Sequence, residues 1–201
     1  MIRHIVFDMG QVLVQFSAGL FTERLHLREE DAALIRREVL ATTEWVRMDR
    51  GTISDDDALE RMCARLPRRL HDTAAYLVHR WNDPIIPVPG MAALTCDLKN
   101  AGYDLYLLSN AAARQHTYWH DIPGSQWFSG TFISADYHLL KPEAAIYQAF
   151  FEKFGLKPEE CLFIDDNPAN IEASENAGMR GIIFHGDAAR LRRQLTELGI
   201  L

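Results

Sequence analysis

The 201 residues include 21 Lys and Arg, 28 Asp and Glu and 48% hydrophobic residues, with a formal net charge of −7. This balance fits one globular α/β domain, or one such domain with a small insertion. It argues against broad binding to nucleic acid or to an anionic membrane, because both need clustered Lys and Arg. The one basic cluster falls in a predicted terminal helix and is interpreted as a solvated face; it consists of Arg190, Arg192 and Arg193.

The cysteines and the N-terminal segment bear on the compartment. Cys63, Cys96 and Cys161 lie far apart among apolar neighbours, with no C-x-x-C spacing, which predicts reduced thiols. The N-terminus is apolar, but Asp8 interrupts it and no small-residue cleavage site follows. No stretch approaches the length needed to cross a bilayer. We therefore expect a cytoplasmic protein.

Five short apolar runs predict buried strands of a parallel sheet. They are residues 4–7, 103–108, 131–134, 161–164 and 181–184. Predicted helices alternate with them, over 91–100, from Pro142 to Gly155, and from Pro168 to Gly178. Proline at a helix start and glycine past its end is the expected asymmetry. The alternation predicts an α/β fold with a doubly wound parallel sheet.

Residues 15–86 depart from this alternation. Helices are predicted over 29–45, from Ser54 to Pro67 and over 72–81. An all-helical block after the first strand is typical of an insertion. The predicted organisation is a catalytic core made of residues 1–14 and 87–201, with an α-helical cap formed by residues 15–86.

Polar residues stand at the ends of three predicted strands, where open α/β sheets bind ligands. Asp8 ends the first strand, Ser109-Asn110 the second and Asp165-Asp166 the fourth, while Lys141 opens the helix before that fourth strand. Taken singly, these residues are typical of a helix cap, a turn, a helix start and a solvated lysine. Their occurrence together, in this order, favours a functional site. Clustered carboxylates repel by about 4 kcal/mol at 4 Å and an effective dielectric near 20, and Mg²⁺ relieves such repulsion.

The series Asp8-x-Gly-x-Val, Ser109-Asn110, Lys141-Pro142 and Asp165-Asp166 resembles the four motifs of the haloacid dehalogenase superfamily. The segments FDMGQVL, LLSNA, KPEAAIYQ and FIDDNPANIEAS are most similar to its bacterial sugar-phosphate phosphatases, glucose-1-phosphate phosphatase among them. The resemblance covers essentially the whole chain, and the helical block resembles the small cap of that family.

The resemblance implies a Mg²⁺-dependent phosphatase that acts on a small phosphorylated metabolite, with sugar phosphates among the candidate substrates. Asp8 would be the nucleophile and form an aspartyl-phosphate. Ser109, Asn110 and Lys141 would contact the phosphate. The implied metal site consists of Asp8, the carbonyl of Gly10, Asp165 and Asp166; either member of the acidic pair could be the direct ligand.

One position departs from the pattern of most phosphatases in the superfamily. They carry a second Asp two residues after the nucleophile as general acid and base, and this chain has Gly10 there. The change is consistent with an inactive enzyme, with a slow one, or with one whose proton donor comes from elsewhere, such as a cap residue or a bound water. If no other donor serves the site, esters with acidic leaving groups should be favoured. Haloacid dehalogenases proper also lack this Asp but need no metal, so a metal-independent 2-haloacid dehalogenase is one alternative. A catalytically silent binding module with the same fold is the other.

Other residues carry weaker signals. His116 and His120, four residues apart, match half of a zinc site, but no further ligands are evident and a surface role is favoured. Trp119 and Trp127 are expected to pack in the core. Three residues of the predicted cap are candidates to face the substrate: Trp45, Asp49 and Arg50.

Overall fold

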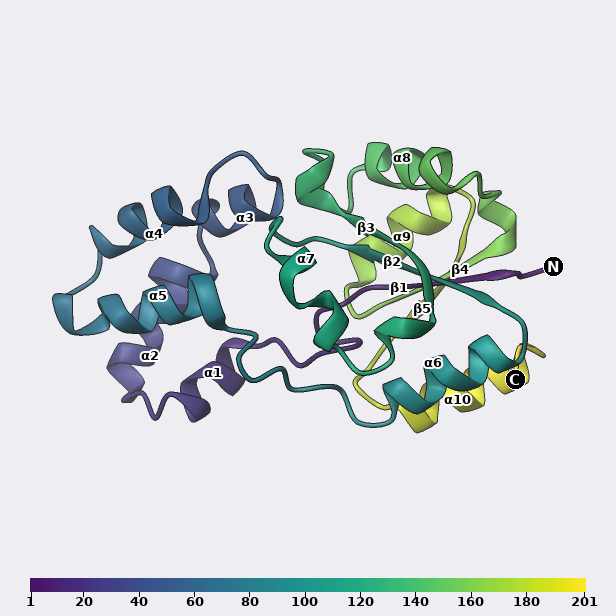
Figure 1. Cartoon of the computed structure of the whole chain (residues 1–201), viewed down its shortest axis with the longest axis horizontal. Helices are drawn as coiled ribbons and strands as arrows, with labels where there is room; N and C mark the ends of the chain where they lie inside the picture. The colour runs from purple at the N-terminus through teal and green to yellow at the C-terminus, as the bar shows by residue number, and fades with distance from the viewer.

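A five-stranded parallel sheet lies at the centre of the larger part of the molecule (Figure 1). The computed structural model describes all 201 residues. The sheet has the order β3-β2-β1-β4-β5, and every neighbouring pair is parallel. Its strands are β1 (His4–Phe7), β2 (Asp104–Ser109), β3 (Phe128–Ile133), β4 (Cys161–Asp165) and β5 (Arg180–Ile183). The predicted α/β fold with a doubly wound parallel sheet is confirmed.

Helices cover both faces of the sheet because successive side chains of a strand point to opposite faces. Ile5 and Phe7 pack with α6 (Met91–Asn100) and α10 (Ala188–Glu197) in one apolar cluster. Val6, between them, packs with α8 (Ala144–Phe154) and α9 (Pro168–Asn176) in the other. Figure 1 shows α8 and α9 on one side of the sheet and α6 and α10 on the other. Strands buried on both faces explain the continuous apolar runs in the sequence.

Most helix-end residues act as expected, but Pro142 does not open α8, which begins at Ala144 with Glu143 as its N-cap. Pro168 occupies the first turn of α9, and the Asn167 side chain accepts a hydrogen bond from the backbone N–H of Ala169 at 2.9 Å. Gly155 ends α8 in a left-handed conformation, with φ of 65°. A side chain other than glycine or asparagine is disfavoured at such a position.

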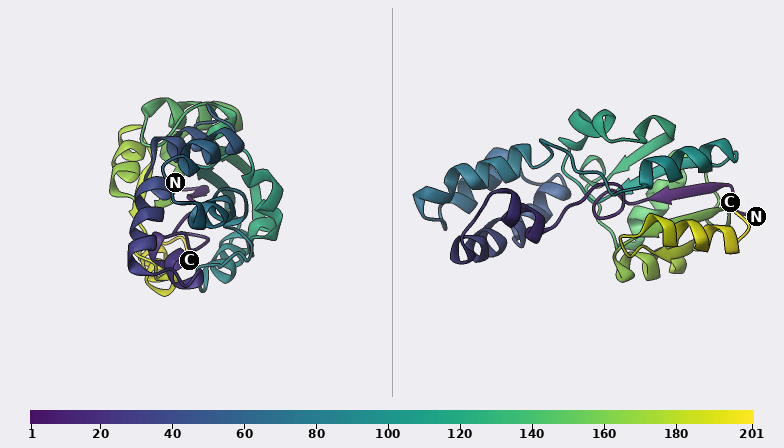
Figure 2. Two further views of the ribbon diagram at one scale, coloured as in Figure 1. Left: turned by 90° about the vertical axis from the view of Figure 1, so that its left-hand side faces the viewer. Right: turned by 90° about the horizontal axis from the view of Figure 1, so that it is seen from below.

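Five helices fill the segment between β1 and α6 and lie beyond one end of the sheet (Figure 2). They are α1 (Ala18–Arg24), α2 (Glu29–Ile35), α3 (Thr43–Asp49), α4 (Asp55–Cys63) and α5 (His71–Arg80). The β1 arrow in Figure 2 points toward this helical insert, so the carboxyl ends of the strands face it. The insert therefore covers the edge of the sheet where ligands of such folds bind.

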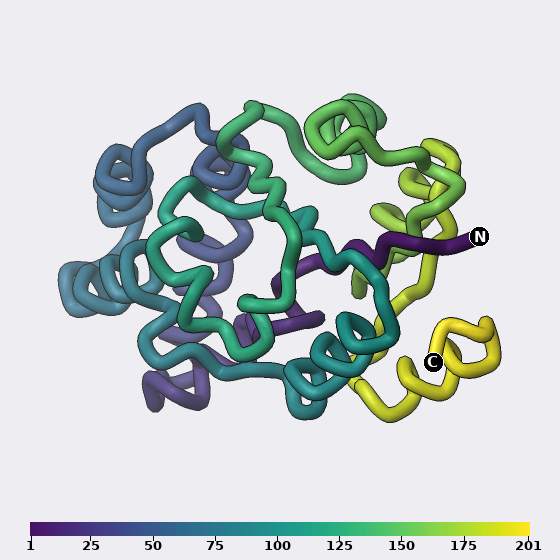
Figure 3. Tube along the Cα trace, turned by 45° about the vertical axis from the view of Figure 1, so that its right-hand side comes forward, coloured from purple at the N-terminus to yellow at the C-terminus, as the bar shows by residue number.

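The segment that leaves the sheet and the segment that returns to it lie side by side. Figure 3 traces the course of the chain. The Val88 N–H donates to the Leu13 carbonyl at 2.9 Å, and the Gln15 N–H donates to the Ile86 carbonyl at 2.7 Å. The predicted boundaries at 14/15 and 86/87 fall at this paired crossing. The division into two domains at those boundaries stays a prediction.

The predicted helix over 29–45 is wrong as a single element. Its α-helical part ends at Ile35, a π-helical turn follows over Arg36–Leu40, and a new helix begins after Thr42. The Thr42 hydroxyl accepts a hydrogen bond from the Trp45 N–H at 3.2 Å, an N-cap that starts α3 in a new direction. Helix α1 was not predicted, although Ser17 caps it by accepting from the Leu20 N–H at 3.1 Å.

Strand bounds agree with the predictions within one residue except at β3, which begins at Phe128 rather than 131. Ser129 and Gly130 carry no apolar side chain, so the strand signal is missing there. Gly130 has a packing reason, because a Cβ at this position would collide with the Phe154 ring.

No helix in the structure has the length and apolar character needed to span a bilayer. The three cysteines are unpaired; Cys161 is buried and the other two are partly exposed.

Candidate active site

Strand order places the candidate site at the carboxyl ends of β1 and β4. From β1 the chain winds to β2 and β3 on one side, then crosses to β4 and β5 on the other. Open α/β sheets bind ligands where the winding reverses in this way. Asp8 directly follows β1, Asp165 is the last residue of β4, and Asp166 comes next.

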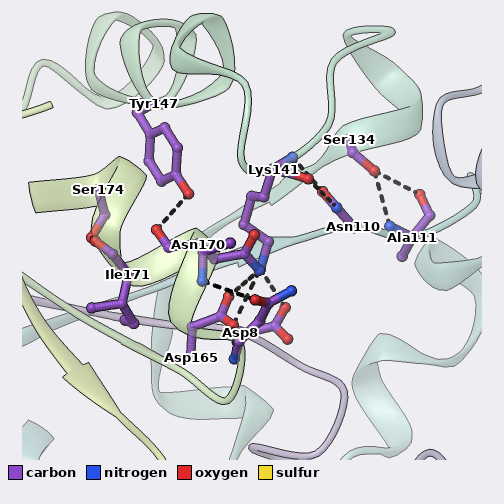
Figure 4. A network of polar contacts seen from close by, with 12 residues as sticks. Asp8, Asn110, Ala111, Ser134, Lys141, Tyr147, Asp165, Asn170, Ile171 and Ser174 are labelled. Carbon is purple, nitrogen blue, oxygen red and sulfur yellow. Dashed lines mark hydrogen bonds and ion pairs between the residues drawn. The ribbon is translucent and has the colours of Figure 1, made fainter. Parts of the chain in front are cut away.

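Lys141 joins the carboxylates of the two strands (Figure 4). Its Nζ donates to Asp8 Oδ1 and to Asp165 Oδ2, each at 2.7 Å. The lysine is 4% exposed, and its ammonium lies 5.2 Å from the centre of the Phe163 ring. A lysine so deeply buried needs this pairing, because an isolated ammonium in the interior is strongly unfavourable.

Asp165 is fully buried and saturated with hydrogen-bond donors. Besides Lys141, its carboxylate accepts from the Asn167 N–H at 2.8 Å and from the Asn170 amide at 3.0 and 3.1 Å. Asn170 is held in turn by Tyr147, whose hydroxyl donates to the Asn170 carbonyl at 2.8 Å. Asp166, by contrast, is exposed and lines the cavity described below.

Asn110 positions Lys141 through its side chain. Its Oδ1 accepts from the Lys141 N–H at 2.8 Å, and its amide donates to the Lys141 carbonyl at 2.9 Å. Ser109 is 1% exposed and does not line the cavity. The structure thus brings Asn110 to the site and leaves the Ser109 side chain outside the cavity. The phosphate contacts expected of both residues stay predictions.

Burial and neighbouring charges shift the titration of this cluster. Burial is the main reason that the pKa of Asp8 rises to about 7; Lys141 lowers it and the charge of Asp165 raises it. Burial lowers the pKa of Lys141, but the two carboxylates outweigh burial and raise it above its usual value. Burial and the Asp165 charge raise the pKa of Asp166 as well. The cluster has an excess of negative charge that one ammonium does not neutralise.

The donor set fits a hard divalent cation. Asp8, Asp165 and Asp166 offer carboxylate oxygens that all lie within 4.8 Å of one another. The carbonyl of Gly10 accepts no backbone hydrogen bond, and the buried Oδ1 of Asn170 has no partner. Mg²⁺ prefers such oxygen ligands, usually one or two carboxylates together with water and substrate phosphate.

A cavity of about 340 Å³ opens over this cluster, between the sheet and the helical insert. The core lines it with polar residues: Asp8, Gly10, Gln11, Asn110, Lys141, Asp166, Asn167 and Asn170. Aromatic rings line it as well: Phe16, Trp45 and Trp81 from the insert and Tyr118 from α7 (Gln115–Tyr118). These rings pack in edge-to-face or tilted pairs with centres 4.8 to 5.8 Å apart. Two carboxyl residues of the insert, Asp49 and Asp55, and Arg114 also line it, so the cavity combines the carboxylate cluster of the sheet with aromatic and charged side chains.

Several lining residues had no predicted role, among them Asn170, Arg114 and the aromatic residues Phe16, Trp81 and Tyr118. Arg114 lies 5.5 Å from the centre of the Tyr118 ring and 3.7 Å from the Asp55 carboxylate. A signal existed only for Asn170, which lies in the first turn of a helix that starts beside Asp165. The others come together through the packing of the insert on the core, which local sequence patterns do not encode.

The weaker sequence candidates separate clearly. Trp45 and Asp49 line the cavity, whereas Arg50 pairs with Glu143 on the rim of the core. His116 is exposed and 2.9 Å from Asp136, and neither it nor His120 belongs to a cluster of metal-ligating groups. Trp119 and Trp127 pack within the apolar core, as expected.

The chain belongs to the haloacid dehalogenase-like hydrolase family, whose family model matches residues 2–178. The predictions of this family and of a hydrolase are therefore confirmed. A sesquiterpene phosphatase of Aspergillus oryzae is 25% identical over 88% of this chain and 87% of that protein. Other curated relatives are longer, and the chain spans only 37% to 45% of three of them.

Solved structures agree on the fold. A family enzyme from Bacteroides thetaiotaomicron, in complex with magnesium and inorganic phosphate, superposes with a TM-score of 0.71 at 20% identity. The similarity covers 95% of this chain and 99% of that one. L-2-haloacid dehalogenase from Xanthobacter autotrophicus superposes with a TM-score of 0.67 at 20% identity, over 100% of this chain and 85% of that one. The shared fold therefore does not separate phosphatases from dehalogenases.

Proposed function

We propose that this hydrolase is a Mg²⁺-dependent phosphatase that cleaves a small phosphate monoester through an aspartyl-phosphate on Asp8. The observation that carries the proposal is the carboxylate cluster under the cavity, in which Asp8, Asp165 and Asp166 lie together and one buried lysine pairs with the first two. Phosphoryl transfer needs such a site, in which a nucleophile and opposing positive charge meet without reorganisation.

Asp8 is the nucleophile because it combines access to the cavity with a fixed orientation. Its side chain is 13% exposed, whereas that of Asp165 is 0% exposed. The Asp8 N–H donates to the Ile164 carbonyl at 2.9 Å, and Lys141 holds one carboxylate oxygen. The other oxygen is left for attack on phosphorus. Lys141 also places an ammonium where charge develops on the transferred group.

Asp8, Asp166 and the Gly10 carbonyl are the residues that would hold Mg²⁺ directly. Asp165 serves them by fixing Lys141, because its own oxygens already accept four hydrogen bonds. Bound Mg²⁺ supplies Lewis-acid polarisation of the phosphoryl oxygens and neutralises the carboxylates. This arrangement supports Asp166, rather than Asp165, as the direct ligand.

The cavity supports a leaving group with an apolar face. Phe16, Trp45 and Trp81 present ring surfaces opposite the carboxylates. A sugar ring has apolar faces that stack on aromatic rings, which fits the predicted sugar phosphate. The relative named as a sesquiterpene phosphatase adds terpenoid phosphates to the classes to be tested. The cytoplasm remains the proposed compartment.

The metal-independent 2-haloacid dehalogenase is the alternative, and a silent binding module is the third possibility. The acidic pair Asp165-Asp166 argues against the dehalogenase, which needs no metal, and the intact pairing of Asp8 with Lys141 argues against a silent module. Phosphate release from 4-nitrophenyl phosphate, measured with Mg²⁺ and with chelator, tests the proposal. Release that stops in chelator and returns with Mg²⁺ supports it. Metal-independent release of halide from 2-haloacids, without phosphate release, would overturn it.

A further inference from the structure

The cavity contains one carboxyl group to which the proposed chemistry assigns no task. Four Asp residues line the cavity, and no Glu or His does. Asp8 and Asp166 belong to the carboxylate cluster, and Asp55 lies 3.7 Å from the Arg114 guanidinium. The remaining one, Asp49, forms no ion pair. It comes from the insert, whereas Asp8 comes from the sheet, so the two carboxyls enter the cavity from different parts of the fold.

The backbone around Asp49 is fixed to the core. Asp49 is the last residue of α3, and its carbonyl accepts a hydrogen bond from the Ser134 hydroxyl, just after β3. The next residue, Arg50, forms an ion pair with Glu143, and its carbonyl accepts from the His138 ring at 3.0 Å. This corner of the insert therefore holds Asp49 in place relative to the sheet.

The residue after Arg50 is Gly51, where the backbone of the insert approaches the backbone of the core. It has φ of 70°, and a Cβ there would collide with the carbonyl of Ala135. The backbone of the insert thus touches the backbone of the core directly after α3. These contacts fix the main chain of Asp49 relative to the sheet.

The surroundings favour the protonated form of Asp49. Burial is the main cause that raises its pKa well above the usual value, and the charges of Asp8 and Asp55 add to it. The backbone N–H of Ala112 offsets part of this rise. Tyr118 and Arg114 are the other titratable side chains on this side of the cavity.

We propose that Asp49 is the general acid and base of the phosphatase reaction and supplies from the insert the group that Gly10 lacks. The inference rests on the proposed function of Asp8. As Asp8 bonds to phosphorus and the ester P–O bond breaks, Asp49 gives its proton to the leaving oxygen, which departs as an alcohol. The Asp49 carboxylate then takes a proton from the water that attacks the phosphorus of the aspartyl-phosphate. Asp8 leaves as a carboxylate, hydrogen phosphate is released, and Asp49 is protonated again.

The test compares two esters whose leaving groups differ in their need for a proton. Nitrophenolate leaves unprotonated, whereas an alkoxide needs an acid. In Asp49→Asn, kcat/KM for 4-nitrophenyl phosphate should change less than about tenfold, while kcat/KM for an alkyl phosphate should fall by about 10²–10⁴. Since the base for the second step is also lost, nitrophenol should appear in a burst of one equivalent per site, followed by slow turnover.

Asp55→Asn is the matched control, because it removes the other insert carboxyl of the cavity. Because Asp55 acts on Asp49 only through its charge, the variant should change the ratio of kcat/KM for the two esters far less than Asp49→Asn does. Asp49→Ala should reproduce the split, and formate should restore part of its activity on the alkyl ester. A double variant, Gly10→Asp with Asp49→Asn, should also recover alkyl phosphate turnover, because a Cβ at Gly10 meets only the Phe16 Cβ at 3.9 Å.

An equal loss of kcat/KM on both esters in Asp49→Asn, or no loss on either, would overturn the role of Asp49. Either result would leave the proposed function standing, provided that the wild-type protein releases phosphate with Mg²⁺. No phosphate release by wild-type protein from either ester would instead refute the proposed function and this inference with it.

Discussion

The two ends of the cavity are built in different ways. At the sheet end, Asp8, Lys141 and Asp165 are joined by short hydrogen bonds and come from segments adjacent to strands and helix starts. At the insert end, aromatic rings pack on one another, and Asp49 and the Asp55–Arg114 ion pair line the same space. The sheet end is suited to one reaction on a group of fixed shape, the phosphate. The insert end is suited to recognising whatever the phosphate is attached to.

We therefore expect mutations at the sheet end to change catalysis and mutations at the insert end to change substrate selectivity. Changes at the sheet end should affect every substrate alike, because every substrate carries the same phosphate. Changes at the insert end should affect substrates according to their leaving groups. Variants of the residues at each end of the cavity test that separation.

Asp8→Asn should lower turnover by at least about 10³-fold for all phosphate esters, because a neutral amide is no nucleophile for phosphorus. The side chains have nearly the same shape, so the fold should be retained. Steady-state kinetics on the purified variant, with circular dichroism as a check of folding, measures this. Comparable activity on any ester would show that the sheet end does not contain the nucleophile.

Lys141→Met should unfold the site as well as inactivate it. The change leaves Asp8 and Asp165 buried without their shared cation, and breaking a buried pair in this way costs about 3–5 kcal/mol. Urea denaturation at neutral pH measures the free energy of unfolding. Lys157→Met is the control, because Lys157 is exposed and its ammonium forms no ion pair; it should cost less than about 1 kcal/mol. Equal losses in the two variants would contradict the account.

The metal-free protein should become less stable as pH rises from about 4 to about 7. The pKa of Asp8 is about 7 in the folded protein, against 3.8 for the unperturbed group. In this window the native state keeps a proton that the unfolded state has lost, so the free energy of unfolding decreases with pH. The decrease due to Asp8 is at most about 4 kcal/mol, at 1.36 kcal/mol per pH unit.

Two comparisons isolate this effect. Asp8→Asn should show a flatter dependence of stability on pH in metal-free buffer, and added Mg²⁺ at pH 7 should restore stability to the wild-type protein. Denaturation curves between pH 4 and pH 8 give both results. Parallel curves for the variant and the wild-type protein would show that Asp8 does not titrate in this window.

Trp45→Ala should raise KM for aryl phosphates by about tenfold to a few hundredfold, since lost apolar contacts of this size are worth about 1–3 kcal/mol. Inhibition by inorganic phosphate should be unchanged, because phosphate occupies only the sheet end. Trp127→Ala is the matched control, since Trp127 packs on the core outside the cavity. It should leave both constants unchanged. A rise in the phosphate inhibition constant in Trp45→Ala would mean that the two ends are not separable.

Tyr147→Phe should have the smallest effect, because it removes one hydrogen bond that supports the network from behind. The Tyr147 hydroxyl donates to the Asn170 carbonyl at 2.8 Å. Its loss should cost about 1 kcal/mol of stability and change kcat/KM by no more than a few fold. Tyr106→Phe removes a hydroxyl with no hydrogen-bond partner and should cost less. Thermal denaturation of both variants measures the difference.

The sheet could be predicted from the sequence because its information is local. Strands buried on both faces are continuous apolar runs, and three of them end beside polar residues that the sheet order then brings to one edge. Pro168 and Gly155 mark helix ends whose geometry depends on those residues alone. Asp8, Lys141 and Asp165 could therefore be proposed as neighbours before their distances were known.

The insert could not be predicted to the same degree because its structure depends on contacts distant in sequence. The break at Thr42 rests on one hydroxyl cap within a segment that otherwise has helical character. The lining residues Phe16, Trp81 and Tyr118 meet only when the insert packs on the core. The burial of Ser109 and the bonding of Asn110 to the Lys141 backbone likewise depend on the folded sheet.

Trapping of the covalent intermediate tests directly whether Asp8 is the nucleophile that forms an aspartyl-phosphate. The protein is mixed with substrate and Mg²⁺, quenched in acid within one turnover, digested and examined by mass spectrometry for peptides that carry added phosphate. If Asp8 is the nucleophile, phosphate should be found on Asp8 and should form and disappear at rates no slower than turnover. The Asp8→Asn variant should yield no phosphorylated peptide. Turnover that proceeds without any phosphorylated peptide in the wild-type protein, or phosphate on a different residue, would contradict this role of Asp8.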